Sequence, residues 1–129
     1  MVGIWSSYSS QYLYVLAIGI LVGFGLPMML VPITFARVLR WHIPEHEYLA
    51  IYFGRCLGGI ACVIAVFGFK VANSPLLQPF FFQLAIWIFC ILTLIHIYGA
   101  LRKIQPISET IEIIFWFGLI ILTLCFYPG

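Results

Sequence analysis

Four ionisable side chains lie inside stretches that are otherwise apolar, and these are the residues whose types could do chemistry. They are Arg55, His96, Glu109 and Glu112. A charge in hydrocarbon costs at least about 2.5–3.5 kcal/mol on insertion scales, so we expect Arg55 to find a carboxylate. Glu112 is the first candidate and Glu109 the second. The two residues are three apart and therefore lie on one helix face. His96 and the hydroxyl of Tyr52 complete this polar cluster.

Two interpretations of the polar cluster stay open. In a functional one, it forms the floor of a cavity in the cytoplasmic leaflet and binds a polar headgroup, a quinone or a proton. In a structural one, Arg55 and Glu112 only hold two helices together. One imidazole and two carboxylates could do acid–base work, but no arrangement in the sequence specifies a reaction. We therefore predict no catalytic residues and expect no enzyme.

A second group of ionisable residues follows the first apolar stretch. His42 and His46 are four residues apart, which would place both imidazoles on one face of a helix. Pro44 lies between them and argues against a helix, so we predict no metal site there. A haem would need an axial ligand inside the membrane, and only His96 qualifies. No cofactor is predicted, with haem and quinone left open.

The elements that must position these residues are indicated by composition. Of the 129 residues, 64% are hydrophobic and only 8% are charged, whereas a soluble domain carries about 25% charged residues. Apolar runs long enough to cross a bilayer, about 20 residues each, occur four times. We predict an all-α membrane protein, a single domain over residues 1–129 that folds as an antiparallel four-helix bundle. Its helices should span about 13–39, 44–70, 75–102 and 108–127.

The basic residues between these helices predict an orientation. Arg37 and Arg40 follow the first predicted helix, and Arg102 and Lys103 follow the third, whereas the intervening turn has only Lys70 nearby. Cytoplasmic loops carry the excess of Lys and Arg. The first and third loops should therefore be cytoplasmic, with both termini on the periplasmic or outer side.

The first predicted helix contains two prolines, Pro27 and Pro32. Each removes a backbone hydrogen bond, so a break or bend is expected there. Such breaks line binding sites in many transporters. A simple kink satisfied by neighbouring helices is the alternative.

Small residues recur at four-residue spacing on the first two predicted helices. Gly19 and Gly23 lie on the first, and Gly54 and Gly58 on the second. Such strips let helix backbones approach closely in lipid. We expect these two helices to pack on each other, or the strips to serve self-association or contact with another membrane subunit.

The run Tyr-Phe-Gly-Arg-Cys-Leu-Gly-Gly at residues 52–59, followed by a short turn and a long aromatic helix, resembles the DoxX-like group of small four-helix bacterial membrane proteins. The resemblance implies a bacterial inner membrane and a four-helix bundle, and it transfers no catalytic residue.

The function that we expect is that of a non-catalytic accessory subunit in a larger membrane complex or of a homo-oligomer. The alternative is a small carrier or a lipid- or quinone-binding protein. Membrane lipids are the expected surroundings. The slight net charge of +2, without any basic run, gives no reason to expect nucleic acid.

Overall fold

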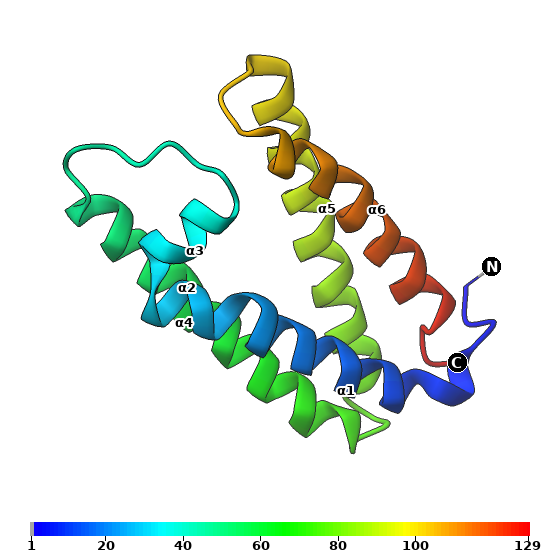
Figure 1. The fold of residues 1–129 in the computed structure, drawn as a ribbon. Coiled ribbons are helices and arrows are strands. Elements are labelled where there is room, and N and C mark those ends of the chain that lie inside the picture. The colour runs from blue at the N-terminus through cyan, green and yellow to red at the C-terminus, as the bar shows by residue number, and fades with distance from the viewer. Residues whose placement is uncertain (1) are drawn as a thin grey trace. The chain divides into compact units, whose positions relative to one another are not determined.

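The computed structural model describes residues 2–129, and it is helical with no strand among those residues. The elements are η1 (Ser6–Tyr8), α1 (Ser9–Ile20), the π-helical turn η2 (Leu21–Gly25), α2 (Leu26–Leu30), α3 (Pro32–Val38), α4 (Tyr48–Ala72), α5 (Gln78–Arg102) and α6 (Ile107–Cys125) (Figure 1). By contacts the chain divides into two compact units, described here one at a time. The first is Met1–Tyr12 with Val71–Gly129, and the second is Leu13–Lys70.

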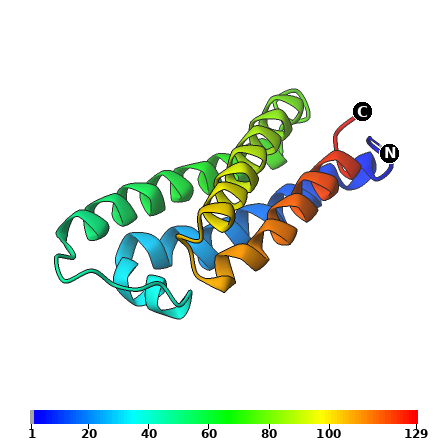
Figure 2. The ribbon, with the colours of Figure 1, turned by 90° about the horizontal axis from the view of Figure 1, so that it is seen from above.

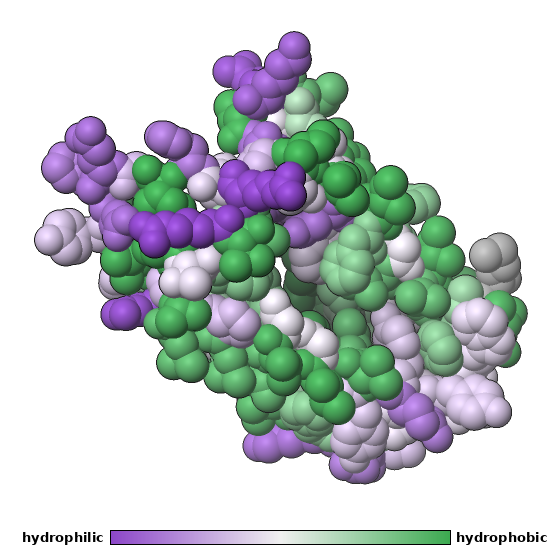
Figure 3. All heavy atoms as spheres, in the orientation of Figure 1, coloured by the Kyte–Doolittle hydropathy of each residue, from purple (hydrophilic) through white to green (hydrophobic). Residues whose placement is uncertain are grey.

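Four helical segments in the described residues are long and apolar enough to cross a membrane: Ser6–Leu30, Tyr48–Ala72, Gln78–Arg102 and Ile107–Cys125. Their outward faces are strongly apolar, with Trp87 70% exposed and Ile114 78% exposed. On the face drawn in Figure 3, hydrophobic side chains cover the flanks of the helices and hydrophilic ones gather at the helix ends. Exposed apolar faces of this kind mark contact with lipid or with other proteins.

In the first unit, α5 and α6 form an antiparallel hairpin (Figures 1 and 2). Ring contacts show the direction: Phe89 lies 5.9 Å from Trp116, and Phe82 lies 5.8 Å from Tyr127 at the far end. The inward stripe of α5 repeats every three or four residues, the period of one helix face. Its buried members are Gln78, Phe81, Phe82, Ala85, Phe89, Thr93, His96 and Gly99.

The N-terminal segment closes the end of α6, and the two ends of the chain lie close together (Figures 1 and 2). The last carbonyls of a helix have no partner inside it. Here the amides of Gly3 and Trp5 donate to the carbonyls of Leu124 and Cys125, each at 2.9 Å. The hydroxyl of Ser9 lies 2.6 Å from the carbonyl oxygen of Phe126. The protein itself thus supplies partners for these three carbonyl groups.

In the second unit, α4 packs directly on the backbone of the first helical segment. A Cβ atom built on Gly58 would lie 2.3 Å from the amide nitrogen of Met29 and 2.8 Å from the carbonyl oxygen of Gly25. One built on Gly54 would lie 2.7 Å from the Cβ of Pro32. Two of the predicted small residues therefore form an intramolecular contact. Small residues permit this approach, which supplies dispersion energy and weak Cα–H···O contacts.

The glycines expected to face α4 from the first helix were wrongly chosen. Gly19 and Gly23 have no atom within 4 Å of an added Cβ, so they lie away from the α4 contact. Gly25 replaces them, with a built Cβ 2.9 Å from the Sγ of Cys62. The π-helical turn that ends at Gly25 changes which residues of the first segment face α4. The four-residue spacing of Gly19 and Gly23 does not indicate this change.

The prolines act on the first segment in two different ways. Pro27 follows the π-helical turn without a break, and the amide of Leu26 donates to Leu21, five residues back. At Val31 the helix stops, with φ −134° and ψ 57°, and α3 restarts with Pro32 as its first residue. A residue before proline is pushed out of the helical region, and proline suits a first helical position. The interruption therefore follows from Pro32.

Some predicted helix boundaries differ from those observed. The first segment begins near Ser6 instead of residue 13, and the Ser9 hydroxyl there bonds to the carbonyls of Ser6 and Phe126. The second predicted helix begins at Tyr48 instead of residue 44. Pro44 restrains the residue before it, and the first helical hydrogen bond of α4 runs from Ile51 to the Glu47 carbonyl. The third begins at Gln78 instead of residue 75.

The backbone contact at Gly58 predicts a selective effect of added volume. Gly58→Ala should lower the free energy of unfolding by about 1–3 kcal/mol, as overpacking does, because backbone atoms stand in the way. Gly19→Ala, in the same unit but with open space around it, should be neutral or stabilise the helix by up to about 1 kcal/mol. Thermal unfolding of both variants in detergent micelles measures the difference. Equal stability of the two variants would contradict this packing.

Candidate functional site

Three side chains converge in the α5–α6 hairpin and form the candidate site. The Nε2 atom of His96 lies 2.9 Å from an Oε2 of Glu109 and 3.5 Å from an Oε2 of Glu112. One ligand atom from each residue lies within 4.8 Å of the other two. Three or more His, Cys, Asp or Glu side chains that lie close enough together can hold one metal ion. Among the described residues, His96, Glu109 and Glu112 form such a group.

The backbone of α5 fixes the imidazole of His96. Its Nδ1 atom lies 2.7 Å from the carbonyl oxygen of Leu92, one turn earlier in the helix. A carbonyl only accepts hydrogen bonds, so Nδ1 carries a proton and donates it. In the neutral imidazole, Nε2 then presents a lone pair to both carboxylates. A proton or a metal ion must sit among these three acceptors for the arrangement to be favourable.

The helices bring the site together from opposite directions. His96 belongs to the inward stripe of α5, and Glu109 and Glu112 lie on one face in the first two turns of α6. The first turn of a helix favours negative charge, which suits the carboxylate of Glu109. The side chains of His96 and Glu109 are each 11% exposed and that of Glu112 is 29% exposed. The site is thus buried, with Glu112 its most accessible ligand.

The loop between the helices holds this geometry. The Nε2 of Gln105 donates to the carbonyl of His96 at 2.9 Å and to the hydroxyl of Thr110 at 3.2 Å. Its side chain lies on Gly99, where an added Cβ would collide with the Gln105 amide. Lys103 adopts a left-handed conformation, φ 55°, that ends α5 and starts the return. One glutamine therefore ties the end of α5 to the start of α6.

Trp116 borders the site from α6. Its ring centroid lies 5.9 Å from that of His96. Its indole N–H is buried without a well-formed hydrogen bond, and it interacts with the Glu112 carboxylate one turn away. Trp116 and Glu112 are four residues apart and therefore share one face of α6.

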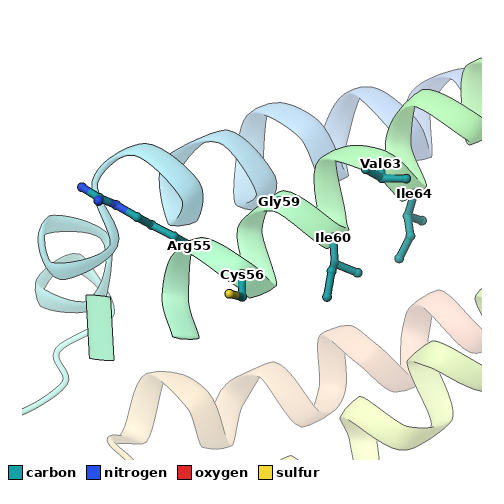
Figure 4. A pocket seen from close by; sticks show the side chains of 6 residues that line it. All are labelled: Arg55, Cys56, Gly59, Ile60, Val63 and Ile64. Atoms are coloured by element: carbon teal, nitrogen blue, oxygen red, sulfur yellow. The ribbon is translucent and has the colours of Figure 1, made fainter. Parts of the chain in front are cut away.

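Arg55 and Tyr52, which the sequence adds to the cluster, belong to the other unit. Arg55 lines a shallow hollow of about 330 Å³ beside the helix interruption, together with Thr34, Arg37 and Glu47. Arg55 also borders a second, apolar hollow, whose lining residues all belong to α4 (Figure 4). Its guanidinium extends toward the α2–α3 segment. Tyr52 is exposed and its ring packs on Phe53. The predicted Arg55–Glu112 ion pair would join the two units and stays a prediction.

The HxxxH pair is not on a helix. His42 and His46 are exposed and lie in the non-helical segment between α3 and α4. Haem ligation by His96 would first require the loss of the contact between its Nε2 and Glu109. The ligand geometry of a metal site thus occurs at His96, where the sequence indicated only a polar cluster.

Three contributors to the site were missed from the sequence. The Leu92 carbonyl is a backbone group, and nothing in the residue types indicates it. Gln105 and Gly99 act as a pair, which requires the loop conformation. The spacing of Trp116, four residues after Glu112, places both on one helix face and would have indicated a contact.

Comparisons of the chain with protein-family models, curated proteins and solved structures find no match. The resemblance to the DoxX-like group therefore stays a prediction. The site of His96, Glu109 and Glu112 is the feature that indicates a function.

Proposed function

We propose that this chain is a multi-pass membrane protein that binds a cation at the site formed by His96, Glu109 and Glu112. The observation that carries the proposal is the convergence of three acceptor atoms in an apolar hairpin. With His96 neutral, the group has two negative charges, which are unfavourable in a low-dielectric setting unless a cation neutralises them. A cation fits this set better than the quinone that the sequence left open, because a quinone brings no positive charge to the three atoms.

The membrane arrangement that we propose is the antiparallel four-helix bundle with both termini on the outer side. Four apolar helical segments and adjacent chain ends support an even number of crossings. Arg102 and Lys103 end α5, and Arg37 and Arg40 end or follow α3, which supports a cytoplasmic side for these loops. The bacterial inner membrane is the proposed location. The site then lies in the cytoplasmic half, since His96 is six residues, about 9 Å, from the end of α5.

Cysteine labelling in whole cells tests this orientation. In a variant without native cysteines, Leu76→Cys lies in the α4–α5 turn and Ile104→Cys in the α5–α6 loop, and both positions are well exposed. A membrane-impermeant maleimide should label Leu76→Cys in intact cells and Ile104→Cys only after permeabilisation. The reverse pattern would show that the loops with the basic residues lie outside.

The accessory-subunit function stays a second proposal, and one surface favours it. Gly19 and Gly23 leave an open strip on the first helical segment, where a second copy or another membrane subunit could approach closely. Gly54 and Gly58 are already used within the chain, so self-association through them would require their contact with the first segment to open.

Cation binding should stabilise the folded protein. A ligand present at 100 times its Kd adds about 2.7 kcal/mol to the free energy of unfolding. We expect at least one metal cation from a panel of alkali, alkaline-earth and transition metals to raise the Tm of the purified protein. Glu109→Gln/Glu112→Gln removes two ligands and should abolish this response.

The matched control is His42→Gln/His46→Gln, which removes the two exposed histidines and should keep the response. A wild-type Tm that no cation changes would refute the proposal. A response that persists in Glu109→Gln/Glu112→Gln would place the bound cation elsewhere.

A further inference from the structure

The chemistry of the three ligands narrows the class of cation. This step rests on the cation-binding function proposed above. Hard cations such as Mg²⁺ and Ca²⁺ prefer all-oxygen sites, whereas an imidazole nitrogen suits first-row transition metals. The site combines one imidazole nitrogen with two carboxylate oxygens. We infer that it binds a divalent first-row transition metal of the Zn²⁺ class, with His96 Nε2, a Glu109 oxygen and a Glu112 oxygen as ligands.

The distances between the ligands fit such an ion. Atoms that lie about 2.0–2.15 Å from a tetrahedral Zn²⁺ are about 3.3–3.5 Å from one another. The observed separations from His96 Nε2 are 2.9 Å to Glu109 and 3.5 Å to Glu112. All three ligand atoms lie within 4.8 Å of one another, so the side chains must move closer together to surround the ion.

The charge balance favours a divalent ion. Metal ligands bind in their deprotonated forms. In those forms the two carboxylates and the neutral imidazole carry a total charge of −2, which a divalent metal reduces to zero. A monovalent ion would leave a net negative charge in the apolar hairpin. Because a net charge is costly there, charge balance selects against Na⁺ and K⁺.

The surroundings already orient the ligands as in known metal sites. A histidine that binds a metal generally donates its other ring N–H to a carboxylate, a backbone carbonyl or water. His96 makes this bond to Leu92 at 2.7 Å. The Trp116 indole, with no well-formed hydrogen bond of its own, interacts with the Glu112 ligand. Neither interaction involves the metal-facing Nε2.

The number of ligands indicates an exchangeable ion. Structural zinc sites are closed by four protein ligands, whereas sites with three keep a position for water or another molecule. Here the chain offers three, and Glu112 is partly accessible at 29% exposure. Three ligands therefore leave a coordination position for an exchangeable molecule, and Glu112 is the most accessible ligand.

Co²⁺ as a spectroscopic substitute for Zn²⁺ tests the inference. The protein is purified without a histidine tag in the His42→Gln/His46→Gln background, so that His96 is its only histidine. We expect one Co²⁺ per chain with visible bands of a nitrogen–oxygen site. The sulfur charge-transfer band expected from binding to Cys56, Cys62, Cys90 or Cys125 should be absent. Zn²⁺ should displace Co²⁺, and a large excess of Mg²⁺ or Ca²⁺ should not.

Variants identify the ligands. His96→Gln and Glu109→Gln/Glu112→Gln should each weaken Co²⁺ binding at least about tenfold, since loss of a ligand exceeds the effect of outer contacts. Gly19→Ala is the control and should bind as the background protein does. Circular dichroism checks that each variant stays helical. If the site variants unfold, X-ray absorption of the Zn²⁺-loaded background protein still decides, by the presence or absence of one histidine nitrogen in the first shell.

The possible failures are distinguishable. Stabilisation by Mg²⁺ or Ca²⁺ that depends on Glu109 and Glu112, without competition from Zn²⁺, would overturn the transition-metal inference and leave the cation-binding function standing. Unchanged Co²⁺ affinity in His96→Gln, or a first shell without imidazole, would overturn it as well. No binding of any cation would overturn both.

Discussion

A polar group buried between apolar helices must find its partner in the protein, because lipid offers none. The α5–α6 hairpin follows this constraint along its length. At the chain ends, two backbone amides of the N-terminal segment satisfy the carbonyls of Leu124 and Cys125, and the Ser9 hydroxyl bonds to the carbonyl of Phe126. At the loop, Gln105 bonds to the carbonyl of His96. Between these two ends, His96 faces two carboxylates. A positive charge among the three side chains would stabilise this arrangement, and the proposed function is to bind the cation that supplies it.

In the second unit, close packing within the protein supports an interrupted helix. Pro32 interrupts the first segment at Val31, which removes helical hydrogen bonds where the segment turns into α3. Gly54 and Gly58 let α4 approach that interrupted backbone closely enough for direct contact. The tight packing supports the irregular backbone at a point where regular helix is absent. Arg55 projects beside this interruption and lines the hollow there (Figure 4).

Composition predicts the number of apolar helices well, because a run of about 20 apolar residues has few alternatives. The same sequence predicts faces poorly. The helix α5 is apolar all round, so its inward stripe has no hydrophobic contrast with its outward face. Ionisable residues are easier to interpret: His96, Glu109 and Glu112 do meet, whereas Arg55 is exposed. The contact of Glu112 with His96 was not singled out, although His96 lies opposite α6 across a short loop. The start of the first helix involves hydrogen bonds from the Ser9 hydroxyl to carbonyl groups. The start of the second follows a non-helical segment around Pro44. Residue types alone specify neither.

The central claim is that the Leu92 carbonyl holds the His96 ring so that Nε2 faces the two carboxylates. Nitrogen-15 NMR of the His42→Gln/His46→Gln protein in lipid bilayers measures this directly, because His96 is then the only histidine. The predicted result is a proton on Nδ1 both without metal and with Zn²⁺, and a metal-bound Nε2 without a proton in the Zn²⁺-loaded protein. A bare Nδ1 with a protonated Nε2, unchanged by Zn²⁺, would contradict the account.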